Sequence, residues 1–154
     1  MKNTGFAALI ALALPALALA APTPAIEIVD GYARTSNPRT GAAFFTIRNH
    51  GADTCSLVSA ASDLSERTEL HTHRENADGM MEMLPMEEPI AIAAGAEHVL
   101  KRGGDHVMFM GLNAPLENGQ EVAFSLDFGD CGKVDVTLPV DNDRKPEEAA
   151  HSGH

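Results

Sequence analysis

Short apolar segments separated by turn residues fill most of the sequence and leave few choices of fold. Within the segments, side chains alternate in hydrophobicity or form brief β-branched and aromatic runs, as strands do. Glycine, asparagine, aspartate and proline separate them at intervals of roughly 8–12 residues, which is typical of a β-sandwich or barrel. The expected strands are 26–34, 41–51, 54–62, 67–74, 79–84, 89–95, 97–103, 106–112, 121–129 and 133–140.

Helical patterning is weak throughout the chain. No stretch repeats apolar residues every 3.6 positions over the length of a helix, and we expect at most one helical turn, at 62–67. The 154 residues are enough for one hydrophobic core and show no internal repeat. The sequence therefore predicts a single all-β domain.

The two ends differ in composition from the middle. Lys2 precedes an apolar, alanine-rich run, and residues 18–20 (Ala-Leu-Ala) have the small-x-small pattern of a signal-peptidase site. We expect a cleaved signal peptide at 1–20, export to the periplasm, and no membrane insertion of the mature chain. The folded domain is expected at 21–140, followed by a disordered acidic tail at 141–154.

Charge narrows the possible partners. The sequence has 11 basic and 22 acidic residues, giving a formal net charge of -11. Such an acidic chain is a poor ligand for nucleic acid or for an anionic membrane and weakly favours cations.

Thioethers and imidazoles are concentrated in one window. Apart from the initiator, all the methionines lie between Met80 and Met110, and His71, His73 and His106 share the same stretch. A hydrophobic core would be expected to distribute methionine over all its strands as a gap-filler. Clustered thioether and imidazole groups instead indicate a site for a soft metal ion. The window contains no cysteine, so a blue-copper site with a thiolate ligand is not expected.

Strand pairing would bring these groups together. The segments ELHTHR and MMEML flank the polar loop ENADG and predict a hairpin. If Arg74 pairs with Met80, His73 lies opposite Met81 and His71 lies opposite Met83, all on one face. Further along, His106 and Met108 are two residues apart and share a face of their own strand. Three strands would thus supply two histidines and two methionines.

These residues and their flanks resemble a known family. The segments ELHTH, DGMMEM, IAAG and GGDHVMFMGL are similar to the periplasmic copper chaperones of the PCu(A)C type. The resemblance implies a cupredoxin-like Greek-key β-sandwich that binds one Cu(I) per chain through His71, Met83, His106 and Met108. His73 and Met81 form an alternative pair one step along the ladder. Two spacings are one residue longer than the family pattern, and Arg102 replaces an expected proline.

The resemblance also implies a role and partners. It predicts delivery of Cu(I) to the dinuclear copper site of cytochrome c oxidase, with a Sco-type thiol protein as a possible co-worker, by a monomer. The alternatives are periplasmic copper storage or resistance, and a redox-active copper protein. No nucleophile elbow, zinc-protease motif or phosphate-binding loop is present, and we do not expect an enzyme.

Two further features bear on the chemistry. Cys55 and Cys131 are the only cysteines, and in an exported protein an even pair is expected to form a disulfide. A redox-active or copper-binding cysteine pair is the alternative, although there is no C-x-x-C motif. His151 and His154 resemble the histidine-rich tails of some relatives and could hold a weak Cu(II) site.

Overall fold

The computed structural model describes residues 24–146, so the expected signal peptide lies outside the described residues. Within this range the chain is all-β. The strands are β1 (Ile26–Asn37), β2 (Thr40–Asn49), β3 (Cys55–Leu57), β4 (Ser59–Ala61), β5 (Ser65–Glu75), β6 (Met81–Pro85), β7 (Ile90–Ile92), β8 (Glu97–Leu100), β9 (His106–Leu112), β10 (Glu121–Asp127) and β11 (Lys133–Pro139), with a 3-10 helix, η1, at Gly129–Cys131. Between residues 24 and 146, no helix is long and apolar enough to cross a bilayer.

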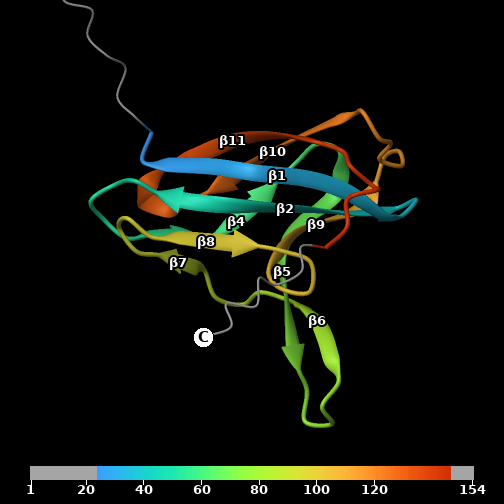
Figure 1. The fold of residues 1–154 in the computed structure, drawn as a ribbon, viewed down its shortest axis with the longest axis horizontal. Helices are drawn as coiled ribbons and strands as arrows, with labels where there is room; N and C mark the ends of the chain where they lie inside the picture. Colours follow the sequence, from blue (N-terminus) through green and yellow to red (C-terminus); the bar gives the residue numbers. More distant parts are fainter. Residues whose placement is uncertain (1–23, 147–154) are drawn as a thin grey trace, which may run out of the picture.

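The strands form a sandwich whose larger sheet carries the four predicted metal ligands. Its order is β1-β2-β9-β5-β6, and β8 pairs with β2. The opposite layer contains the three-stranded sheet β11-β10-β4, and β3 pairs with β7 separately. Figure 1 shows the β5–β6 hairpin extending beyond the body of the sandwich. The predicted cupredoxin-like β-sandwich is confirmed.

Alternation along two central strands explains where the core lies. On β9, Val107 and Phe109 are fully buried in the main core between the layers. Their neighbours His106 and Met108 point to the other face of the sheet, because side chains alternate along a strand. Phe44 on β2 lies on this outer face in a second, smaller cluster with Tyr32 and Ala42. The large sheet is therefore buried on its inner face and partly covered on its outer face.

Most expected strands are present, but the segment at 54–67 differs from expectation in two ways. The expected strand at 54–62 is divided into β3 and β4, and the expected helical turn at 62–67 is a turn followed directly by β5. Both differences have one cause. Val58 N–H donates to the carbonyl of Asp127 at 2.8 Å, and Ser62 Oγ donates to the carbonyl of Ala123, so β10 sets the path of this segment.

The predicted register of the β5–β6 hairpin is wrong by two residues. Arg74 pairs with Glu82 instead of Met80, and His73 pairs with Met83. Asn76 sets this register, because its Oδ1 accepts the backbone N–H groups of residues 78 and 80, and its own N–H donates to the Met80 carbonyl. The loop is therefore built around residues 76–80 instead of 75–79. A shift of two keeps the same side chains on the same face.

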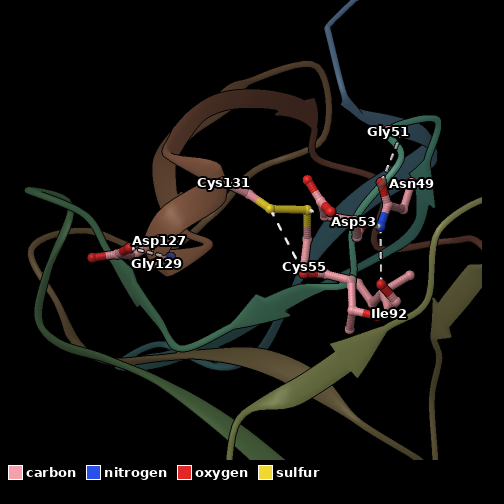
Figure 2. The surroundings of a disulfide bond; sticks show 9 residues. Asn49, Gly51, Asp53, Cys55, Ile92, Asp127, Gly129 and Cys131 are labelled. Carbon is pink, nitrogen blue, oxygen red and sulfur yellow. Dashed lines mark hydrogen bonds between the residues drawn. A yellow bond between two sulfur atoms is a disulfide. The ribbon is translucent and has the colours of Figure 1, made fainter.

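A disulfide joins Cys55 to Cys131, as predicted (Figure 2). Cys55 begins β3 and Cys131 ends η1, with their Cα atoms 5.8 Å apart. Beside it, the buried Asn49 side chain donates from Nδ2 to the Ile92 carbonyl and accepts the Gly51 N–H. The bond and these contacts fix the β3–β7 pair against the rest of the fold. No sulfur of these cysteines remains free to bind metal.

The segment after β11 is held against the domain. Asp141 N–H donates to the Ala33 carbonyl at 2.9 Å, and the Arg144 guanidinium lies 4.3 Å from the centre of the Tyr32 ring. The structure thus differs from the expected disorder at 141–144, because the Asp141 backbone and the Arg144 side chain find partners on β1 that the polar composition does not reveal. The two tail histidines, and any Cu(II) site they form, lie outside the described residues.

Removing the disulfide should destabilise the fold substantially. The cysteines are 76 residues apart, and closing such a loop stabilises the folded state by about 4 kcal/mol in the chain-entropy treatment. We expect the Cys55→Ala/Cys131→Ala double variant to lose up to this amount of unfolding free energy in urea denaturation. Wild-type protein under reducing conditions is the matched control and should unfold at a similar urea concentration. An unchanged midpoint in both samples would contradict this account.

Candidate metal centre

Three of the four predicted ligands form one patch on the outer face of the large sheet. His71 on β5 pairs directly with His106 on β9, and Glu69 pairs with Met108 one step along the same ladder. The three side chains are buried, with exposures of 6% for His71, 3% for His106 and 9% for Met108. The ring centroids of the two histidines are 6.0 Å apart. A bond from an imidazole nitrogen to a metal is about 2 Å long, so one ion fits between rings at this separation.

The fourth predicted ligand, Met83, lies apart from this patch. It is 42% exposed, and every residue of its strand, β6, is exposed. The corrected register places Met83 opposite His73, while Pro85 lies opposite His71. Met83 is therefore a diagonal neighbour of His71, and such neighbours on a sheet are typically about 7–8 Å apart.

His73 lies closer to the patch than sequence reasoning suggested. Its ring centroid is 5.5 Å from that of His106, slightly nearer than the centroid of His71. The sequence placed His73 with Met81 as an alternative pair. In the structure Met81 lies opposite Glu75, and His73 lies opposite Met83. The structure thus brings three histidines together where two were selected.

A single backbone carbonyl orients two of these rings. Gly104 O accepts from Nδ1 of His106 at 2.9 Å and from Nδ1 of His73 at 3.3 Å. A carbonyl oxygen can only accept, so in both rings the proton is on Nδ1. A neutral imidazole carries only one N–H, and Nε2 of each ring is left with a lone pair. Hydrogen bonds of this kind set the tautomer of histidines that bind metals.

Glu69 plays the same part for His71, with the nitrogens exchanged. Nε2 of His71 donates a hydrogen bond to Oε2 of Glu69 at 3.0 Å, since a carboxylate can only accept. In the neutral ring, Nδ1 of His71 then carries the lone pair, and it is buried and without a hydrogen-bond partner. Buried polar atoms are almost always paired, and an orphaned lone pair here is what a metal ligand requires. Sequence reasoning missed Glu69, although its position two residues before His71 places both on one face.

Aromatic side chains close the other side of the patch. The ring of Phe44 lies 5.9 Å from that of His106, and Tyr32 packs on Phe44 with centroids 5.3 Å apart.

Burial lowers the pKa of His106, and the nearby His71 and His73 act in the same direction. The hydrogen bond to Gly104 and the charge of Asp105 oppose the shift. His106 therefore tends to remain neutral, the form that binds metal.

Nitrogen and oxygen ligands alone do not complete a site in this region. Among residues 24–146, no three histidine, cysteine, aspartate or glutamate side chains converge closely enough to hold an ion. Met108, buried next to the two paired histidines, is the additional donor that the patch offers. The combination of imidazole and thioether suits a soft ion and suits zinc or magnesium poorly.

Comparison with known proteins agrees with this fold. The family described as "Putative lipoprotein LpqE-like" matches residues 26–140. A curated relative, described as "Putative lipoprotein Lxx21020" of Leifsonia xyli subsp. xyli (strain CTCB07), is 32% identical over 115 residues, which cover 75% of this chain and 69% of the relative.

Solved structures extend the comparison. Apo-DR1885 from Deinococcus radiodurans is 31% identical, with a TM-score of 0.58 over 92% of this chain and 97% of that one. Its Cu(I) form is similar over 75% of this chain and 79% of that one, with a TM-score of 0.54. The apo PCuAC domain from PmoF1 is 18% identical, with a TM-score of 0.63, covering 77% of this chain and 94% of that domain.

The fold is that of the PCu(A)C domains, a β-sandwich with a histidine- and methionine-bearing outer face. Within that class, the chain belongs to the LpqE-like family, whose match spans most of the described residues.

The lowered pKa of His106 predicts how the metal-free protein responds to pH. Between that pKa and the unfolded value of about 6.5, the unfolded chain binds more protons than the folded one. The contribution of His106 to the free energy of unfolding should therefore be fully present above pH ~6.5 and should decrease as the pH falls below this value. Urea denaturation of metal-free protein from pH 5 to 8 measures this. His106→Gln should flatten the slope, whereas His50→Gln, which alters an exposed histidine paired with Glu27, should retain it.

Proposed function

We propose that this protein is an exported copper chaperone that binds Cu(I) on the outer face of its large sheet and passes it to another protein. The proposed ligands are Nδ1 of His71, Nε2 of His106 and the sulfur of Met108, with Met83 as a further donor from the hairpin. The proposal rests mainly on the buried, unpaired Nδ1 of His71. The apolar side chains of this sheet face offer that nitrogen no hydrogen-bond partner, whereas a metal ion would use its lone pair.

The choice of Cu(I) follows from the donor set. Thioether sulfur is soft and neutral and favours Cu(I) among the common biological metals. Both cysteines are in the disulfide, so the described residues offer no thiolate to stabilise a blue-copper centre. The 31%-identical DR1885 has been solved with Cu(I), which supports the same cargo here.

The accessibility and the charge of the donors favour transport of the ion over storage. His71, His106 and Met108 are buried on one side, whereas Met83 on the hairpin is accessible to an approaching partner. All four donors are neutral, so the ion binds less tightly than it would to thiolates and can be released. Methionine also resists oxidation in an oxidising compartment better than an exposed thiol does. The role is transport of an ion and requires no catalysis by the chain.

The recipient and location are part of the proposal. We infer delivery to the dinuclear copper site of cytochrome c oxidase, with a Sco-type thiol protein as co-worker, in the periplasm after removal of residues 1–20. The relatives described as lipoproteins support export. Incubation of Cu(I)-loaded protein with the soluble copper domain of the oxidase subunit tests the transfer, with metal content measured after separation.

Replacing the buried ligands should weaken Cu(I) binding without unfolding the protein. His71→Gln and Met108→Leu each remove one donor, and the methionine-to-leucine change preserves volume at a cost below about 1.5 kcal/mol. We expect each to lower Cu(I) affinity at least about tenfold, the smaller end of the loss seen when the support of a metal ligand is removed. Met83→Leu should have a smaller effect. Competition with a Cu(I) chelator measures the affinities, and Met80→Leu, which alters a loop methionine of the same hairpin, is the control.

The pH dependence of Cu(I) affinity distinguishes histidine from methionine ligands. Thioethers do not titrate, whereas an imidazole must be neutral to bind, and its ordinary pKa is about 6.5. Affinity should be nearly constant at high pH and should fall in acid, where two bound histidines give a limiting slope of about two decades per pH unit. Because burial lowers the pKa of His106, the full slope should begin below the ordinary value. A flat profile from pH 4.5 to 8 would remove the histidines from the site.

A further inference from the structure

His73 has the features of a metal ligand, yet it lies outside the proposed buried site. Its Nδ1 donates to Gly104 O, so its Nε2 carries a lone pair, as in His106. It is half-buried and shares the outer face of β5 with His71, two residues away. Its cross-strand partner is the exposed Met83. An imidazole and a thioether thus face each other at the rim of the patch.

His106 lies within reach of both groups of ligands. Its ring centroid is 6.0 Å from His71 on one side and 5.5 Å from His73 on the other. Because its Nδ1 is bound to Gly104, the single free nitrogen, Nε2, must serve either neighbour. The three imidazoles form a continuous series from the buried His71 to the half-buried His73.

The side chains of the hairpin strand are far more exposed than those of the buried patch. The exposed fractions are 3% for His106, 6% for His71 and 9% for Met108, against 42% for Met83 and 59% for Met81. The hairpin that carries the exposed methionines extends beyond the sandwich (Figure 1). A metal complex approaching the protein would therefore meet Met83 and His73 before it could reach His71.

We propose that His73 and Met83 form an outer station on which Cu(I) is captured before it moves to the inner station of His71, His106 and Met108. His106 binds the ion in both positions, and Met83 remains a weaker donor to the ion after it has moved inward. Each step exchanges one coordinate bond for another, with Cu(I) unchanged in oxidation state. With neutral rings no proton is released, since the hydrogen bonds of each ring occupy its other nitrogen. Release to a recipient follows the reverse order. The inference rests on the proposed copper site and adds the route into it.

A kinetic intermediate leaves a signature distinct from that of a ligand in the final site. Removing an outer-station ligand raises the barrier for uptake and release equally, so both rates fall and the equilibrium affinity stays nearly constant. Removing an inner ligand lowers the affinity itself. His73→Gln and His71→Gln are therefore a matched pair of variants on one strand face.

The experiment measures Cu(I) transfer from its coloured bicinchoninate complex to the full mature chain in a stopped-flow instrument, together with release to excess chelator. We expect His73→Gln to slow both directions by about tenfold or more, within the range over which association rates vary among variants, and to change the affinity by less than about threefold. Met83→Leu should also slow uptake. His50→Gln and Met80→Leu, which alter exposed side chains outside the patch, should match the wild type.

The outcomes separate this inference from the proposed function. If the wild-type protein takes up no Cu(I), the proposed function fails. If the wild type binds Cu(I) but His73→Gln behaves like His50→Gln, the outer station alone is overturned. If His73→Gln lowers the affinity as much as His71→Gln does, His73 belongs to a single site and the outer station is again overturned. Circular dichroism confirms that each variant is folded.

Discussion

The two-residue repeat of β-strands governs this structure. Because Leu70, Val107 and Phe109 point into the sandwich, their neighbours on β5 and β9 must point outward. Those neighbours are His71, His106 and Met108. The hydrophobic effect that closes the core therefore also fixes the side chains of the proposed metal site on the other face. A slip of one residue between the strands would exchange the two sets and destroy both the core and the site.

Hydrogen bonds orient each of the three histidines on the outer face. Gly104 O holds the δ-protons of two rings, and Glu69 holds the ε-proton of the third. Asp105 holds the Gly104 turn in place. Its side chain accepts a hydrogen bond from the Thr72 hydroxyl at 2.6 Å, and its Oδ2 lies 2.9 Å from Nε2 of His98. Thr72 stands between two of the histidines on β5. The network thus connects the turn before β9 to the strand it pairs with, and the imidazoles are oriented before any ion arrives.

The sequence predicted the parts of this structure that depend on local pattern. Alternation and turn residues located most strands, and an even pair of cysteines in an exported chain predicted the disulfide. The clustering of methionine and histidine directed attention to one window of the chain, and the folded sheet brings His71, His106 and Met108 of that window together. The hairpin register depended on how the Asn76 side chain caps its own loop, a choice that apolar alternation does not settle. The parts played by Glu69 and Gly104 arise from contacts between side chain and backbone that only the folded chain defines, and the choice of ligands itself remains a prediction.

The exposed edge strand of the hairpin could promote aggregation, and features of that strand reduce this tendency. Among the described strands, β6 pairs with β5 alone, so its outer edge presents unpaired backbone groups beside apolar side chains. Such edges invite a second copy to add its own strand. Here the strand spans only Met81–Pro85, carries the charged Glu82, and ends in a residue with no N–H to donate. The chain can therefore expose thioethers on this strand to solvent while discouraging edge-to-edge aggregation.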